Sequence, residues 1–452
     1  MYWANFLHIY QPPTQSREIV EQVAAESYRT LITVLERFPD AKVTLNVTAC
    51  LTEQLDRHGL GDVIAGIRAL AERGQVELTG SAKYHPILPL IPEDEVRRQI
   101  ELNTETNRAF FGDVYQPRGF FPPEMAISRR VLEIIAEMGF TWVIADEIAR
   151  DGTIGRSVDN VCYELPGLPE LHVFFRERML SHALETRQVA SGAQFQRAVE
   201  PCLRQGGDGY LLTGTDGEFY GHHIKGLETV LSVAYKSGTP PTCTVSELLD
   251  RFPERRVVDP RASSWTTWPD ELERDIAYPQ WCYPKHAIHK LQWRLTNAVL
   301  QLVQSSPTRD GYAAARRLLD EGLYSCQYFW ASCRLSWSTD MVLRGADRLL
   351  AAAEALDAAP THKRVLDIQR LHRELHTLVW DWQNTGKPRA IRRTYKSAHA
   401  EFYPQPDEED DQAGEGPSDS LVSTGGDDTT HEPPRETPTA SPDDRPLDPA
   451  RD

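Results

Sequence analysis

The alternation of short apolar runs with longer amphipathic segments, from Met1 to about Arg251, is the feature that most restricts the fold of this chain. Short runs rich in β-branched and aromatic residues are typical of buried strands, whereas apolar residues that recur every three or four positions are typical of helices. Their alternation predicts βα units around a parallel sheet. Seven strands are predicted, at 3–9, 43–47, 76–79, 119–121, 142–145, 171–175 and 210–215.

Amphipathic segments between these runs, such as 17–38 and 128–140, are predicted to be helices on the outside of the sheet. Seven strands with helices between them favour a closed or nearly closed parallel barrel over an open sheet. The spacing of the strands is compatible with both arrangements.

The character of the sequence changes after Pro253. A loop-rich, tryptophan-rich stretch is followed by strong helical periodicity to about Trp382, and the chain beyond position 404 offers little to bury. We therefore expect an α/β domain over 1–255, a loop and helical-bundle domain over 256–403, and a disordered acidic tail over 404–452.

The net charge of −17 is concentrated at the C-terminal end. Residues 401–452 contain 16 acidic and 3 basic residues, so the other 400 residues carry a net charge of only −4. A nearly neutral body has no basic surface for neutralising phosphates, which argues against a nucleic-acid partner.

The seven cysteines are scattered and form no CxxC pair, a pattern that indicates reduced thiols in a cytoplasmic protein. The N-terminal residues lack the basic and apolar regions of an export signal, and no 18-residue apolar run follows. We expect no membrane insertion. The oligomeric state is not predicted.

Ionisable residues follow six of the seven predicted strands. In parallel α/β barrels, functional side chains lie on the loops at the carboxyl ends of the strands. Here these ends read HIYQPP, GSAKYHPILPL, FFPPEMAIS, ADE, FRER and TDGEFYGHH. Each motif is weak by itself, and their shared position indicates a functional site.

Glu124 and Asp216 are the strongest candidates for acid–base chemistry. Local sequence also allows simpler roles, because Glu124 suits the first turn of a helix and Asp216 suits a turn. Two carboxyl groups about 5.5 Å apart are the arrangement that retaining glycosidases use. The sequence favours such a pair at the fourth and seventh strand ends.

The motifs HIYQPP, GQVELTGSAKYHPILPLI, GFFPPEMAIS, LLTGTDGEFYGHH and, more loosely, SCQYFWAS resemble the five ordered sequence regions of glycoside hydrolase family 57. The resemblance covers about residues 1–250 well and the helical part loosely. It implies an incomplete (β/α)7 barrel, a helical domain that closes over the cleft, and a retaining mechanism on α-glucans. It also implies that neither a metal nor a cofactor takes part in the chemistry.

Carried over by motif, Glu124 corresponds to the family's nucleophile and Asp216 to its general acid/base. His8, Gln11 and His85 correspond to residues that contact the sugar, and for His85 a buried histidine bonded to the backbone is the alternative. The family favours a second histidine where this chain has Tyr10, which leaves the role of that position open.

Other motif residues complete the predicted site. Arg176, at the sixth strand end, is expected to orient the nucleophile, with a surface ion pair as the alternative. Glu218 and His222 are expected to fix Asp216. Trp265, Trp268 and Trp330 are candidates for stacking on pyranose rings, and interdomain packing is the alternative for each of them.

Two other functions remain possible at this point. Asp216, His222 and His223 are residue types that bind a divalent cation, as in a metal-dependent polysaccharide deacetylase. A catalytically silent, glucan-binding relative would keep the fold without turnover, and the tyrosine at position 10 is compatible with it.

Overall fold

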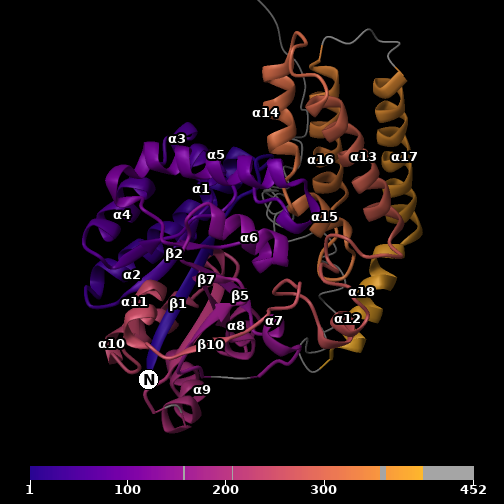
Figure 1. The fold of residues 1–452 in the computed structure, drawn as a ribbon. Coiled ribbons are helices and arrows are strands. Elements are labelled where there is room, and N and C mark those ends of the chain that lie inside the picture. Colours follow the sequence, from indigo (N-terminus) through magenta and orange to yellow (C-terminus); the bar gives the residue numbers. More distant parts are fainter. Residues whose placement is uncertain (156–157, 206, 357–362, 401–452) are drawn as a thin grey trace, which may run out of the picture.

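The computed structural model describes residues 1–155, 158–205, 207–356 and 363–400. Seven parallel strands form the centre of the N-terminal part, and each overlaps one of the predicted strands (Figure 1). They are β1 (Tyr2–Ile9), β2 (Val43–Val47), β3 (Val76–Leu78), β4 (Gly119–Phe120), β5 (Trp142–Asp146), β7 (Leu168–Arg176) and β8 (Tyr210–Asp216).

These strands form an incomplete barrel rather than one continuous ladder. One sheet has the order β3-β2-β1-β8 and the other contains β7-β5-β4. A parallel bridge between Gly80 and Phe120 joins β3 to β4. On the other side, the Glu177 amide donates to the Leu212 carbonyl at 2.7 Å, between the end of β7 and β8.

Helices surround the strands, as the alternating pattern predicts. They are α1 (Arg17–Val23), α2 (Arg29–Arg37), α3 (Ala49–Arg57), α4 (Gly61–Glu72), α5 (Glu93–Phe111), α6 (Arg129–Glu137), α7 (Ile148–Asp151), α8 (Arg178–Glu185), α9 (Gly192–Gln205), α10 (Glu228–Ser237) and α11 (Val245–Arg251). Short 3₁₀ turns lie at Leu88–Leu90, Gly112–Val114, Pro123–Met125 and Gly217–Phe219. Phe6, Phe121 and Trp142 are buried in one apolar cluster with residues of β7 and β8.

A helical region follows the barrel (Figure 1). It has its own apolar core. Its helices are α12 (Pro269–Glu273), α13 (Ala287–Gln304), α14 (Tyr312–Gly322), α15 (Cys326–Ala331), α16 (Thr339–Glu354), α17 (Lys363–Thr385) and α18 (Lys387–Ala398). The fold class is therefore as predicted, an α/β barrel followed by helices. The boundary at 255/256 stays a prediction, and the whole predicted tail, 404–452, lies outside the described residues.

Three details differ from the sequence expectation. The segment predicted as one helix over 17–38 contains a π-helical turn, η1 (Ala24–Tyr28), between α1 and α2. Helical structure continues beyond Trp382, because Gly386 takes a positive φ of 69° and α18 starts directly after it. Short strands were also missed: β6 (Cys162–Leu165), β9 (Thr242–Cys243) and β10 (Arg255–Val257).

Candidate active site

A cavity of about 420 Å³ lies at the carboxyl ends of the barrel strands, under residues of the helical region. Every residue predicted for the site lines it. These are His8, Tyr10, Gln11, His85, Glu124, Arg176, Asp216, Glu218, His222, Trp265, Trp268 and Trp330. The residues predicted from the strand ends are thus distant in the sequence and lie together in the structure.

The backbone conformation around Glu124 is itself unusual and fixes the direction of the side chain. Glu124 has φ 61° and Met125 has φ 47°, a left-handed backbone conformation that residues other than glycine rarely adopt. The amides of Met125 and Ala126 donate to the carbonyls of Pro122 and Pro123 at 2.8 and 3.0 Å, which closes a tight turn. Strained backbone of this kind is typical of functional positions.

Two donors hold the Glu124 carboxyl group. Trp265 Nε1 donates to Oε2 at 2.9 Å, and the Ser325 hydroxyl donates to Oε1 at 3.3 Å. Burial raises the pKa of Glu124 to about 7, and the two hydrogen bonds oppose this rise. Both donors therefore favour the ionised form.

Asp216 ends β8, directly beside His8 at the end of β1. Its Oδ1 is buried and has no hydrogen-bond partner among the described residues. Burial, followed by the negative charges of Glu218, Glu185 and Glu124, raises the pKa of Asp216 well above its ordinary value. The protonated form is favoured, as a general acid requires.

Glu218 is held by the helical turn that follows β1. The Tyr28 hydroxyl donates to Glu218 Oε1 at 2.6 Å, and the Tyr10 amide donates to the same oxygen at 3.0 Å. The Ser27 hydroxyl donates to the Gly217 carbonyl at 2.8 Å. The π-helical turn η1 thus carries two of the contacts that position the loop after β8, a frequent use of such turns.

Three aromatic side chains stack along one wall of the cavity. The ring centroids of Tyr10 and His85 are 4.2 Å apart, and those of His85 and His8 are 4.9 Å apart. Asn46 donates its amide group to Thr79 and therefore offers its oxygen to His8 Nδ1, at 2.8 Å. Burial lowers the pKa of His8 to about 3, so its ring is neutral.

His85 is also a neutral ring. Burial, with a contribution from His8, lowers the pKa of His85 well below its ordinary value. Its Nδ1 lies 2.9 Å from the Ser325 hydroxyl, whereas its buried Nε2 has no partner in the described part of the chain. One polar atom of His85 is therefore available to a ligand.

Arg176 does not make the contact expected of it. Its guanidinium donates to Glu185 at 2.9 Å, to Asp146 at 3.1 Å and to the Gly214 carbonyl at 2.6 Å, and no bond to Glu124 is present. It also lies over the Trp265 ring, at 5.4 Å from the centroid. The arrangement differs from the expectation because Asp146, which is fully buried, provides a closer carboxylate.

His222 also has a different partner from the one expected. Its Nδ1 lies 2.6 Å from Glu26 Oε2 in the π-helical turn, so it fixes this turn rather than Asp216 directly. Among the described residues, Asp216, His222 and His223 do not gather as a metal-binding group. The ligand set of the deacetylase hypothesis is thus not assembled.

The three tryptophans differ in their surroundings. Trp265 is half-buried and bonded to Glu124. Trp268 is buried and donates to the Tyr395 hydroxyl of α18 at 2.7 Å, which matches the packing alternative. Trp330 is half-buried and lines the cavity, so it stays a candidate for stacking on a ligand.

A family model for glycosyl hydrolase family 57 matches residues 5–260, more than half of the chain. The chain belongs to glycosyl hydrolase family 57. The deciding match covers β1 from residue 5, the other six barrel strands and both candidate carboxylates.

Individual relatives from this family match only part of the chain and at low sequence identity. An α-amylase of Pyrococcus horikoshii is 30% identical over 146 residues, which are 32% of this chain and 22% of that protein. The match thus spans about a fifth of the length of such curated relatives.

Solved structures of family 57 proteins share the fold. A branching enzyme of Pyrococcus horikoshii superposes with a TM-score of 0.64 at 17% identity, covering 82% of this chain and 94% of that one. A 4-α-glucanotransferase of Thermococcus litoralis superposes with a TM-score of 0.62 at 18% identity, covering 79% and 59% of the two chains.

Sequence reasoning missed two residues with direct roles in the geometry. Ser325 bonds to both Glu124 and His85, and it is the first residue of the SCQYFWAS motif, in which the sequence predicts a role only for Trp330. Asp146 anchors Arg176, and it lies at the fifth strand end, in the noted motif ADE. In both cases the motif was the available signal.

Proposed function

We propose that this protein is a retaining glycosidase or transglycosidase that acts on α-glucans such as starch, glycogen or maltooligosaccharides. The observation that carries the proposal is the joint placement of Glu124 and Asp216. They come from different strand ends and line one cavity, and the negative charge of Glu124 contributes to the raised pKa of Asp216. Family membership and the names of relatives, α-amylase and 4-α-glucanotransferase, support the substrate class.

Glu124 is the proposed nucleophile. In its ionised form it attacks the anomeric carbon and forms a covalent glycosyl-enzyme. Trp265 donates a hydrogen bond to Oε2 and Ser325 donates one to Oε1, which keeps the carboxylate in a single orientation for attack.

Asp216 is the proposed general acid. Its raised pKa keeps the proton until the leaving oxygen accepts it. In the second half-reaction, Asp216 takes a proton from water or from a sugar hydroxyl, and the glycosyl group leaves Glu124 for that oxygen. Hydrolysis and transfer thus share one intermediate.

The neutral rings of His8 and His85 suit hydrogen bonding to sugar hydroxyls, because they exchange donors and acceptors without bringing charge into the cavity. Gln11 and Trp330 also line the cavity and are proposed to bind the glucan, with Trp330 stacking on a pyranose face. Arg176 is proposed to act through Asp216, since its positive charge opposes the rise of that pKa.

Substitution of Glu124 by Gln tests the assignment directly. Glutamine keeps the shape, and its single carbonyl oxygen can still accept from Trp265, but it cannot form the ester, so turnover falls at least about tenfold while glucan binding persists. Initial rates on maltoheptaose and affinity electrophoresis in glycogen measure the two properties. Activity above about a tenth of the wild-type rate would overturn the assignment.

Product analysis distinguishes the possible outcomes of the common intermediate. Incubation with amylose, maltoheptaose and glycogen, followed by chain-length and linkage analysis, separates hydrolysis from disproportionation and branching. Shorter chains alone identify a hydrolase, longer as well as shorter chains a transferase, and new branch points a branching enzyme.

Tyr10 favours a second candidate, a glucan-binding relative without turnover, because it replaces the histidine that the family favours. Its ring stacks on His85 inside the cavity. The Glu124→Gln comparison also tests this candidate, since a silent protein would show glucan binding and no rate in either form.

The proposed location is the cytoplasm. All seven cysteines are free, as expected of a protein in a reducing compartment. Within the described ranges, no helix has both the length and the apolar character that a membrane crossing requires. The proposed partner is the glucan, and no nucleic acid is expected.

A further inference from the structure

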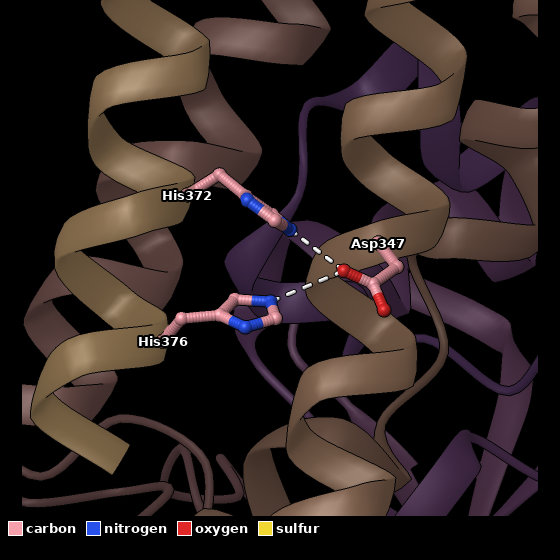
Figure 2. A group of neighbouring side chains, drawn as sticks. All are labelled: Asp347, His372 and His376. Carbon is pink, nitrogen blue, oxygen red and sulfur yellow. Dashed lines mark hydrogen bonds and ion pairs between the residues drawn. The ribbon is translucent and has the colours of Figure 1, made fainter. Parts of the chain in front are cut away.

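Three metal-binding side chains meet in the helical region, between α16 and α17 (Figure 2). His372 and His376 are one turn apart on α17, so they project from the same face of the helix. Their Nε2 atoms lie 2.7 and 3.1 Å from the same oxygen of Asp347, on α16. Two helices thus present two imidazoles and one carboxylate to a common point.

The donor atoms fit a single small cation. All three lie within 4.8 Å of one another. Bonds of about 2.0–2.2 Å in a tetrahedral zinc site place neighbouring ligand atoms roughly 3.3–3.6 Å apart, so small side-chain movements are sufficient. Imidazole ligands suit zinc and other transition metals, whereas Mg²⁺ and Ca²⁺ prefer oxygen ligands alone.

A simple ion pair does not explain why both rings point at one oxygen. Exposed pairs contribute only about 0–1 kcal/mol each, so pairing with Asp347 gives little reason to place a second histidine on the same face of the helix. The ring centroids of the two histidines are 4.2 Å apart, so the two imidazoles lie close together beside the same oxygen.

The neighbouring glutamate is not part of the group. Glu374 lies between the two histidines in the segment HRELH, but its carboxylate accepts from Arg370, one turn earlier, at 3.1 Å. In the described chain, no fourth His, Cys, Asp or Glu joins the group. With 57% of the Asp347 side chain exposed, a water molecule can complete the coordination.

We propose that Asp347, His372 and His376 form a binding site for a divalent transition-metal ion, for which Zn²⁺ is the best match. The ion would connect α16 to α17 directly, besides the chain segment that joins the two helices. None of the three residues lines the active-site cavity. The proposal is therefore independent of the glucan chemistry and stands or falls separately.

Calorimetric titration of the full-length, chelator-treated protein with ZnCl₂ tests the site. The double variant His372→Ala/His376→Ala is expected to bind one equivalent of zinc fewer than the wild type. Alanine is a strong helix former, so α17 should persist in the variant, which circular dichroism verifies. Zinc should also raise the melting temperature of the wild type and not that of the double variant.

Two matched controls exclude other zinc ligands. His58→Ala removes a half-buried histidine that belongs to no such group, and Cys282→Ser removes an exposed thiol. Both are expected to keep the wild-type stoichiometry. If the double variant does not fold, His376→Ala alone serves, with zinc affinity expected to fall on the order of tenfold or more. Absence of saturable zinc binding in the wild type, or unchanged binding in the histidine variants, would overturn the proposal.

Discussion

At the scale of single residues, the site gives different pKa values to two carboxyl groups whose acidity in water is similar. Both are buried, and burial raises both pKa values. Glu124 receives hydrogen bonds on both oxygens, whereas Asp216 faces further carboxylates and has a buried oxygen that lacks a described partner. The environment therefore favours ionisation of Glu124 before Asp216, in the order that a nucleophile and an acid require.

Glu218→Gln is predicted to move the alkaline limb of the pH–rate profile toward lower pH. The negative charge of Glu218 is the largest cause after burial of the raised pKa of Asp216. Removing that charge lowers this pKa, so Asp216 loses its proton at lower pH and the acid form disappears earlier. The pH dependence of kcat/KM measures the shift.

Glu72→Gln is the matched control for this prediction, because Glu72 is an exposed carboxylate on α4 that pairs with Arg68. Its pH profile should match that of the wild type. An alkaline limb that stays in place, or moves upward, in Glu218→Gln would contradict the assigned order of ionisation.

At the scale of elements, the strand-end rule explains what the sequence could predict. A βα alternation fixes which end of each parallel strand carries the site, so His8, Glu124 and Asp216 were identifiable without coordinates. Antiparallel β6 falls outside the parallel βα alternation, and the two-residue β9 lies in the segment TPPTCT, which has no apolar run. The π-helical turn was also hidden, because it changes the helix within an unbroken apolar period.

This π-helical turn makes close contact with the loop after β8. At Gly221, which has φ 101°, an added Cβ would lie 2.2 Å from the backbone oxygen of Glu26. Gly221→Ala is therefore predicted to destabilise the protein by about 3 kcal/mol or more, through backbone strain and a clash that no side-chain movement can relieve. Urea denaturation followed by fluorescence measures the loss.

A substitution at Gly226, in the same loop, measures the effect of backbone strain without a steric clash. It has φ 87°, and nothing lies within 4 Å of an added Cβ. Gly226→Ala should cost only about 1–2 kcal/mol, the conformational penalty alone. Equal losses in the two variants would show that the contact with Glu26 does not constrain the loop.

At the scale of the whole molecule, the active site combines residues from two separate stretches of the sequence, the barrel and the helical region. The barrel provides the carboxylates, and the helical region provides Ser325 and Trp330. Which helical residue reaches Glu124 depends on contacts more than 200 positions apart in the chain, and no local pattern encodes them. The Ser325 amide also donates to the His85 carbonyl at 3.0 Å, which ties the start of α15 to the barrel.

The attachment of α14, which precedes Ser325, rests on buried charges. Arg316 donates to both oxygens of Glu95, on α5, at 2.8 Å, and Gln304 donates to the same carboxylate at 2.8 Å. Arg98 of α5 in turn donates to Asp320, at 2.7 Å for the shortest bond. Because the side chain of Glu95 is only 2% exposed, its charge is compensated by the protein and not by water.

Glu95→Ala is predicted to lower the free energy of unfolding by about 3 kcal/mol, because it leaves the buried Arg316 without its bidentate partner. It should also reduce kcat, since α14 positions Ser325 against Glu124. Glu374→Ala is the control: it removes an exposed pair with Arg370, and its effect should stay within about 1 kcal/mol with unchanged kcat. If Glu95→Ala loses stability but keeps the full kcat, α15 holds its place over the barrel independently of α14.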